Sequence, residues 1–179
     1  MQTVNGARPR RIAMSLIPDT VVFQKRLATL PLATYQAGET VFAAGSRTGR
    51  LLNLRKGAVA IVKETIEIAK VAEPGAVFGE LSALLDQPHT ADVRALETSQ
   101  FHVADAADLL AQDPIALLYV AVVLARRLDG ANQALIELKS QVQAGQPPSV
   151  IGKTVEKMEG LLGDSGASLY AGDPYDSYA

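Results

Sequence analysis

The sequence predicts a mainly β domain with flanking helices, and three observations support this prediction. Between Leu32 and Val103, short apolar runs alternate with glycine-containing turns at even spacing, which is typical of an antiparallel sandwich or barrel. From Ala104 to Val142 the apolar residues recur at helical spacing instead. The chain has 179 residues, 48% of them hydrophobic, which suits one packed domain with extensions.

The residues before Leu32 divide into an arm and a helix. Residues 1–16 are polar and basic, with no long apolar run that would mark a signal peptide, and we expect a disordered arm. An amphipathic helix is predicted for Ile17–Leu30, because Pro18-Asp19 suits a helix start and Pro31 suits an end. The folded domain is therefore predicted for residues 17–143.

Short strands and turns follow in order. The turns contain Gly38, Gly45, Gly57 and Gly75, and the predicted strands are 40–42, 50–54, 58–63, 70–72, 90–95 and 100–103. Residues 63–67 must reverse the chain between two of these strands. They include neither Gly nor Asn-Gly, the usual hairpin signals, so this hairpin lacks a sequence signature.

The most informative stretch is Phe78–Ala95, which reads FGELSALLDQPHTADVRA. Gly79 permits a tight turn, residues 80–85 suit a single helical turn, and Pro88 ends that turn. Residues 90–95 then alternate polar and apolar side chains, as a strand does. A tight turn leading into a short helix presents several backbone N–H groups together, which suits an anion, usually a phosphate.

This stretch resembles the phosphate-binding cassette of the cyclic-nucleotide-binding domain family, found in catabolite-activator-type regulators, kinase regulatory subunits and gated channels. The family pattern is Phe-Gly-Glu-Leu-Ala-Leu-Leu, three variable residues, then Pro-Arg-Thr-Ala-x-Val-x-Ala. The resemblance extends over roughly residues 20–142, with the turn glycines in matching positions. It implies an antiparallel β-roll or jelly roll with a long C-terminal dimerisation helix, and a non-enzymatic role in signal transduction.

The resemblance also implies a set of ligand-binding residues. In the family, the Glu that matches Glu80 accepts a hydrogen bond from the ribose 2′-hydroxyl; alternatively, Glu80 caps the short helix. Backbone N–H groups and one hydroxyl would surround the phosphate, and Asn132 would lie near the base. The implied ligand is a cyclic nucleotide, cAMP or cGMP, and the implied contacts are Phe78, Gly79, Glu80, Leu81, Ser82, His89, Thr90, Ala91 and Asn132.

One departure bears on binding, since His89 stands where the family has Arg. The guanidinium of arginine is always charged, whereas a histidine with an ordinary pKa near 6.5 is mostly neutral at pH 7. Losing one charge-assisted hydrogen bond costs about 1.5–3 kcal/mol. We therefore expect weak or atypical binding, or pH-dependent binding, unless Arg50 or Arg94 substitutes.

A long helix is predicted for about residues 114–143, with Asp113-Pro114 at its start and Asp105 or Asp108 capping a shorter helix before it. Its apolar residues step alternately by four and three, which is typical of a coiled-coil seam. The seam favours a parallel homodimer over a helix folded back on its own domain. The predicted interface residues are Leu117, Leu124, Leu128, Leu135 and Leu138.

Residues 144–179 are predicted to be a linker and a mostly disordered tail, with a short amphipathic helix at Val150–Leu162. Such a tail is too short and polar for a helix-turn-helix reader, and the net charge is −2, so we expect no DNA partner. The apolar run at 115–125 is too short to span a bilayer, and a chain without cysteine fits the cytoplasm.

No nucleophile elbow, P-loop or zinc-protease helix is present, and His89 and His102 lack the partners of a metal pair, so we expect no catalytic, metal or cofactor site. Two hypotheses remain. The chain is either a homodimeric cyclic-nucleotide-binding regulatory module that signals to an unknown partner protein, or a degenerate domain that serves only dimerisation and protein–protein interaction.

Overall fold

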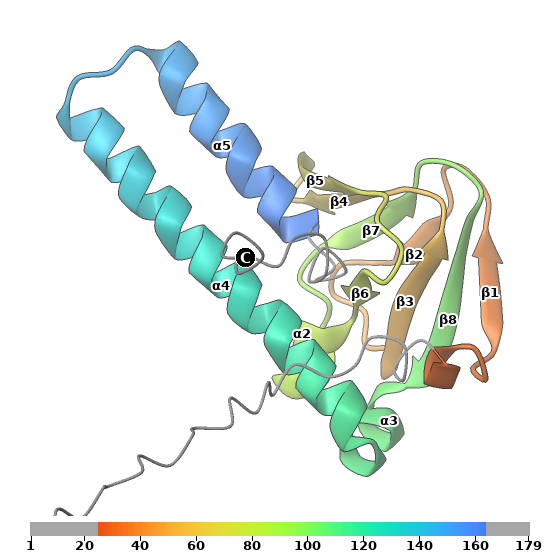
Figure 1. Cartoon of the computed structure of the whole chain (residues 1–179). Coiled ribbons are helices and arrows are strands. Elements are labelled where there is room, and N and C mark those ends of the chain that lie inside the picture. Colours follow the sequence, from red (N-terminus) through yellow and green to blue (C-terminus); the bar gives the residue numbers. More distant parts are fainter. Residues whose placement is uncertain (1–24, 164–179) are drawn as a thin grey trace, which may run out of the picture.

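The computed structural model describes residues 25–163, with side chains through Lys157, and places two four-stranded antiparallel sheets face to face (Figure 1). One sheet has the order β1-β8-β3-β6 and the other β2-β7-β4-β5. The strands are β1 Leu32–Tyr35, β2 Thr40–Phe42, β3 Arg50–Lys56, β4 Val59–Lys63, β5 Ile66–Val71, β6 Val77–Phe78, β7 Asp92–Ala95 and β8 Ser99–Asp105. The predicted mainly β jelly-roll architecture is confirmed.

The hairpin between β4 and β5 forms without glycine. Lys63 pairs with Ile66, so Glu64 and Thr65 alone make the turn, and both have positive φ, 49° and 73°. A two-residue turn of this kind suits the twist of the strands but normally uses Asn-Gly. Because the chain reverses this early, β5 begins at Ile66, and the prediction of a strand confined to 70–72 was wrong.

We expect the double variant Glu64→Asn, Thr65→Gly to be more stable than the wild type by about 1 kcal/mol or more. A β-branched side chain in the left-handed region lowers stability by roughly 1–2 kcal/mol, and glycine avoids this cost because it has no β-carbon. Chemical denaturation measures the difference. Asn-Gly placed in this turn without any gain in stability would contradict the assigned turn geometry.

Two clusters of buried residues make up the core. The first fills the space between the sheets, where Phe101 contacts both Tyr35 and Phe78 edge-on at ring-centroid distances of 5.7 and 6.0 Å. The second lies where the helices cover the sheet of β3. Its buried members are Leu27, Leu51, Val77, Ala106, Ala116, Tyr119, Val120 and Val123.

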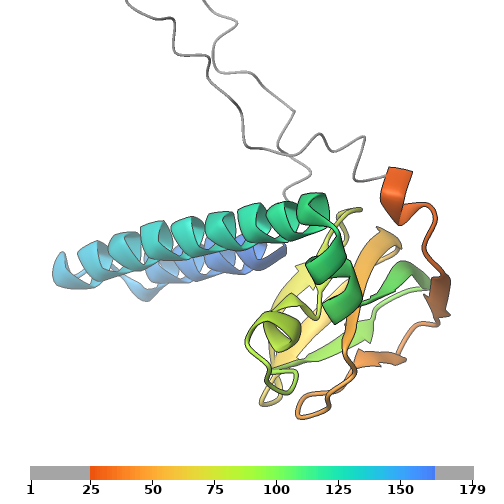
Figure 2. The same cartoon turned by 90° about the horizontal axis from the view of Figure 1, so that it is seen from below.

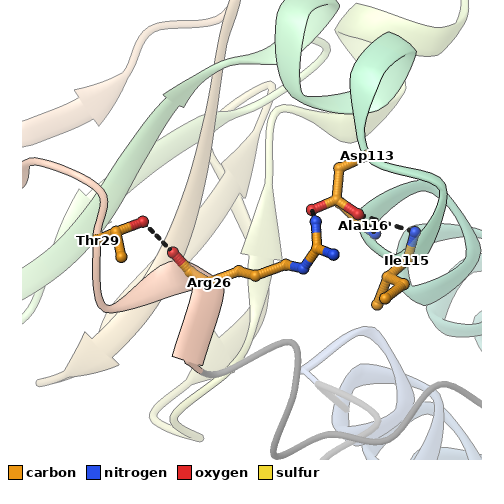
Figure 3. A network of polar contacts seen from close by, with 5 residues as sticks. All are labelled: Arg26, Thr29, Asp113, Ile115 and Ala116. Carbon is orange, nitrogen blue, oxygen red and sulfur yellow. Dashed lines mark hydrogen bonds and ion pairs between the residues drawn. The ribbon is translucent and has the colours of Figure 1, made fainter.

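The helices after the sheets begin where their caps predict. Asp105 accepts a hydrogen bond from the Asp108 amide and starts α3 (Ala106–Gln112). Asp113 accepts the amides of Ile115 and Ala116 and starts α4 (Pro114–Gln143), while Arg26 binds its other carboxylate oxygen (Figure 3). Burial tends to raise the pKa of Asp113, but these contacts outweigh it and lower that pKa.

Helix α5 (Pro148–Gly163) folds back along α4, and both views show the two helices side by side and projecting beyond the sheets (Figures 1 and 2). Thr154, which is buried, donates to Gln141 at 2.9 Å, and Lys157 pairs with Glu137 at 3.1 Å. The C-terminal part of α5 reaches β5. The helix predicted at 150–162 is confirmed, with one to two more residues at each end.

Other expectations lie partly or wholly outside the described residues. The arm at 1–16, most of the helix predicted at 17–30 and the tail after residue 163 fall outside the described range. Among the described helices, none alone has the length and apolar character needed to cross a bilayer; only α3 and α4 taken together meet that criterion, and they bend by 106°.

Candidate functional site

A cavity of about 190 Å³ opens between the sheet β2-β7-β4-β5, the short helix α2 (Glu80–Leu84) and α4. It lies where the cassette meets strands β4 and β5, and it is smaller than the roughly 300–1,000 Å³ of typical small-molecule pockets. Eight of the nine predicted ligand residues line it, and these are Phe78, Gly79, Glu80, Leu81, Ser82, His89, Thr90 and Ala91. The ninth, Asn132, is exposed on α4 and does not line it.

Gly79 sets the entry to the cassette. It has φ 91° and precedes α2 (Glu80–Leu84), a single short helix as predicted. A β-carbon at this position would lie 2.3 Å from the backbone oxygen of Arg50 and 3.3 Å from the ring of Phe42. Only glycine therefore fits both the dihedral angle and the close approach of β3. The far end of the turn closes through Ser82, whose hydroxyl donates to the Gln87 carbonyl.

Glu80 is buried and already paired. Its Oε1 accepts from Nη1 of Arg127 at 2.8 Å, and the two side chains are only 6% and 14% exposed. Nη2 of Arg127 is 3.5 Å from the Val77 carbonyl oxygen. Burial raises the pKa of Glu80, and the Arg127 charge partly offsets that effect. The pair joins the cassette to α4.

Arg127 is a site residue that the sequence argument did not single out. It lines the cavity, and its Nε is buried without a hydrogen-bond partner in the described part of the chain. A signal was available in the helical spacing. Arg127 follows Val123 by four residues and precedes Gly130 by three, and both of these are buried, so its side chain falls on the domain-facing side of α4.

His89 is held in place by three kinds of contact. Its ring stacks on Phe42 at a centroid distance of 4.1 Å with an interplanar angle of 21°, and its Nε2 lies 2.9 Å from Thr48 Oγ1. Its amide donates to the Ser46 carbonyl at 2.9 Å, and its carbonyl accepts from Gly45 at 2.8 Å. Burial lowers the pKa of His89, so the ring stays neutral at pH 7.

The two arginines suggested as substitutes for the cassette Arg do not occupy the cavity. Arg94 points outward from β7 and pairs with Asp92 at 2.8 Å, and Arg50 does not line the cavity either. The lining does include a second basic residue, Lys63, from the end of β4. Sequence reasoning missed Lys63 because its strand ends in a hairpin without a signature.

The predicted dimer seam divides between two environments. Leu117, Leu128 and Leu135 are 42%, 62% and 57% exposed, whereas Leu124 and Leu138 are half-buried. Leu124 contacts the second core cluster. The exposed part forms an apolar strip along α4, continued by the exposed Val142.

A metal ion needs a close grouping of ligating side chains. Across the described residues, no three His, Asp or Glu side chains lie close enough together to hold a metal ion. The side chains that line the cavity are instead a buried ion pair, a neutral imidazole, a lysine and an apolar remainder. Such a lining is suited to hold a small polar molecule.

Comparison with one solved structure supports the fold, and others are similar over part of the chain. The structure described as "Sp-2Cl-cAMPS bound to PKAR CBD2" is 20% identical with a TM-score of 0.51, over 70% of this chain and 80% of that chain. The structure "cAMP bound PfPKA-R (141-441)" is 21% identical with a TM-score of 0.46, over 68% and 39%, so this chain spans well under half of it.

A third similar structure is the N-terminal domain of a transcriptional regulator from Streptomyces coelicolor A3(2), with 27% identity and a TM-score of 0.46 over 62% and 82%. No curated protein matches the chain. Residues 32–112 match the family model described as "Cyclic nucleotide-binding domain". That range includes every strand described above and the whole lining of the cavity except Arg127.

Proposed function

Since the chain contains a cyclic nucleotide-binding domain at residues 32–112, we propose that it is a non-enzymatic regulatory module that binds a cyclic nucleotide such as cAMP or cGMP. One observation above all supports this proposal. Eight cassette residues converge on one cavity, and the cavity is closed on the α4 side by Arg127.

Binding is weak because the cassette lacks a charged group at position 89. The neutral His89 ring offers no permanent charge, and the cavity of about 190 Å³ must enlarge to admit a nucleotide. Enlargement involves α4, since Arg127 on that helix is tied to Glu80. A ribose hydroxyl that donates to Glu80 competes with Arg127, and this competition shifts the population of α4 positions.

Calorimetric titration of the wild type with cAMP and cGMP at pH 6 and pH 7.5 tests the proposal. We expect weak binding with little difference between the two pH values, because burial lowers the pKa of His89 and so disfavours its charged form. Binding that tightens at pH 6 would instead identify protonated His89 as the missing cation. No heat, with an unchanged melting temperature, would overturn ligand binding.

The variant His89→Arg is expected to bind cAMP at least about tenfold more tightly than the wild type. It restores a fixed charge at the cassette, and a charge-assisted hydrogen bond is worth about 1.5–3 kcal/mol. The variant His89→Gln, which is polar and neutral, is the control and should show no gain. Equal affinities for the Arg and Gln variants would mean that position 89 does not face the ligand's charge.

The module acts as a homodimer through α4 in this proposal. The strip of Leu117, Leu128, Leu135 and Val142 is exposed along one side of the helix, although α5 occupies another side. The leucines recur at the heptad spacing that pairs two helices. Folding back of α5 and dimerisation of α4 therefore use different faces of the same helix.

The variant Leu135→Asp is expected to convert the dimer to a monomer, because it places a charge in the centre of the strip. Light scattering over a concentration series measures the mass. Ile136→Asp is the matched control, since Ile136 is 70% exposed but lies about 100° away around the helix. A wild type that is monomeric at high concentration would contradict the proposed assembly.

The small cavity and the buried His89 ring, which stacks on Phe42, also favour a second candidate. This candidate is a degenerate domain used only for dimerisation and for docking a partner protein. Under this alternative the dimer survives but neither nucleotide binds, and His89→Arg creates no binding. The two titrations above and the light-scattering series separate the two functions.

A further inference from the structure

The charges on the cavity wall do not balance. Glu80 and Arg127 neutralise each other at 2.8 Å, and the neutral His89 adds nothing. Lys63 remains, and its ammonium group has no ion pair or hydrogen bond within the described residues. Glu67, an acidic residue on the same hairpin, forms an ion pair with Lys70 at 3.3 Å. Among the described side chains, the wall therefore carries one uncompensated positive charge.

Strand register directs Lys63 towards the cavity. Side chains alternate along a strand, so Lys63 shares a face with Val59, which is buried in the core between the sheets, and with Ile61, which lines the cavity. The irregularity in this hairpin does not disturb that alternation. Ile61 pairs with Ala69 and Val62 with Glu67, so the extra residue belongs to β5 and β4 stays regular.

The same register places Lys63 next to the cassette. On its other side β4 pairs with β7, with Ile61 opposite Val93 and Val62 opposite Asp92. Lys63 and Ala91 are the next residues of the two segments beyond this last pair, and both line the cavity. Lys63 is thus beside the segment His89–Ala91, although it is distant from it in sequence.

The turn that follows Lys63 supports a functional reading of its position. Glu64 and Thr65 both adopt positive φ, which is unfavourable for these residue types. Backbone strain of this kind persists where the surrounding structure holds it, and it concentrates near functional sites.

We propose that Lys63 supplies the positive charge that pairs with the anionic group of the ligand, in place of an arginine at position 89. This inference rests on the proposed function and adds its recognition chemistry. The ligand is a small monoanion, such as a cyclic phosphodiester, and its charged group lies between β4 and the Thr90–Ala91 segment. In this proposal the cation comes from strand β4, whereas in the family pattern it comes from the cassette.

Calorimetry with cAMP at pH 7.5 tests this assignment on four proteins, which are the wild type, Lys63→Gln, Lys63→Arg and Lys70→Gln. We expect Lys63→Gln to weaken binding about tenfold or more, as loss of a charge-assisted contact does. Lys63→Arg keeps the charge and should bind within a few-fold of the wild type. Lys70→Gln removes the same charge from the same hairpin but outside the cavity, and it should bind like the wild type.

The outcomes separate the two levels of the proposal. Failure of the wild type to bind cAMP or cGMP overturns the proposed function, and the role of Lys63 falls with it. A wild type that binds, with unchanged affinity in Lys63→Gln, overturns only the role of Lys63. Equal weakening of cAMP binding by Lys63→Gln and Lys70→Gln also overturns the role of Lys63. That result would indicate the summed electrostatic field of the charges on the hairpin, and not a contact between Lys63 and the ligand. Lys63 is exposed, so folding of the variants is not at risk.

Discussion

Replacement of Gly79 by alanine is expected to cost about 2–5 kcal/mol of stability. A residue with a β-carbon at φ 91° costs roughly 1–2 kcal/mol, and forcing it into a packed site costs about 1–3 kcal/mol more. The clash is severe because the nearest atom, 2.3 Å away, is the backbone oxygen of Arg50 and not a flexible side chain. Strand β3 must shift for the variant to fold.

A matched control exists in the same domain. Gly38 has φ 86°, but a β-carbon there meets nothing within 4 Å, so Gly38→Ala should cost only the roughly 1–2 kcal/mol of the unfavourable dihedral angle. Urea unfolding of both variants isolates the contribution of close packing. Equal losses of stability at Gly79 and Gly38 would show that steric contact with β3 adds nothing to the cost at Gly79.

The second large effect is expected for Arg127→Met, which should lower stability at pH 7 by about 3 kcal/mol. Breaking a buried ion pair by removing one partner leaves the other charge buried and uncompensated. Here the remaining charge is Glu80, whose side chain is 6% exposed. Unfolding by denaturant at pH 7 measures the loss. Arg47→Met is the control, because Arg47 pairs with the fully exposed Asp86, and no measurable change is expected.

The sign of the pH dependence follows from the pKa of Glu80. Burial raises that pKa above its ordinary value, so the folded state binds a proton at a higher pH than the unfolded state does. Without Arg127 the pKa rises further. The loss in free energy of unfolding caused by Arg127→Met should therefore become smaller as the pH falls through this raised pKa. Adding Glu80→Gln to the same chain should recover most of that free energy at pH 7. A deficit that is constant from pH 7 to pH 5 would contradict an ionised Glu80.

Local sequence signals predicted much of the fold. Gly79, Asp105 and Asp113 each have one physical reason to be where they are, a left-handed dihedral angle or a helix cap, and each reason is visible in a few neighbouring residues. The cassette was predictable for the same reason, since its eight lining residues come from one continuous stretch. The hairpin at Glu64-Thr65 was not, because its turn uses residues that favour no such geometry.

The two basic residues of the cavity were missed because their roles depend on tertiary contacts. Lys63 and Arg127 lie 64 positions apart in the chain and meet the cavity only through the pairing of β4 with β7 and the packing of α4. The contacts that hold the His89 ring likewise come from Phe42 and Thr48, more than 40 residues away. Spacing along the sequence does not report such contacts.

The length of α4 gives its anchoring a mechanical consequence. The helix has 30 residues, or about 45 Å at 1.5 Å per residue, and its buried residues nearest the sheets lie in its first ten positions. A tilt of about 10° at Asp113 would carry the tip of this rod by ~8 Å, and α5, which packs along α4 and reaches β5, would have to move with it. Arg127 lies almost halfway along this rod. A change of a few ångströms at the Glu80 contact is therefore about doubled at the tip, where the loop between α4 and α5 begins.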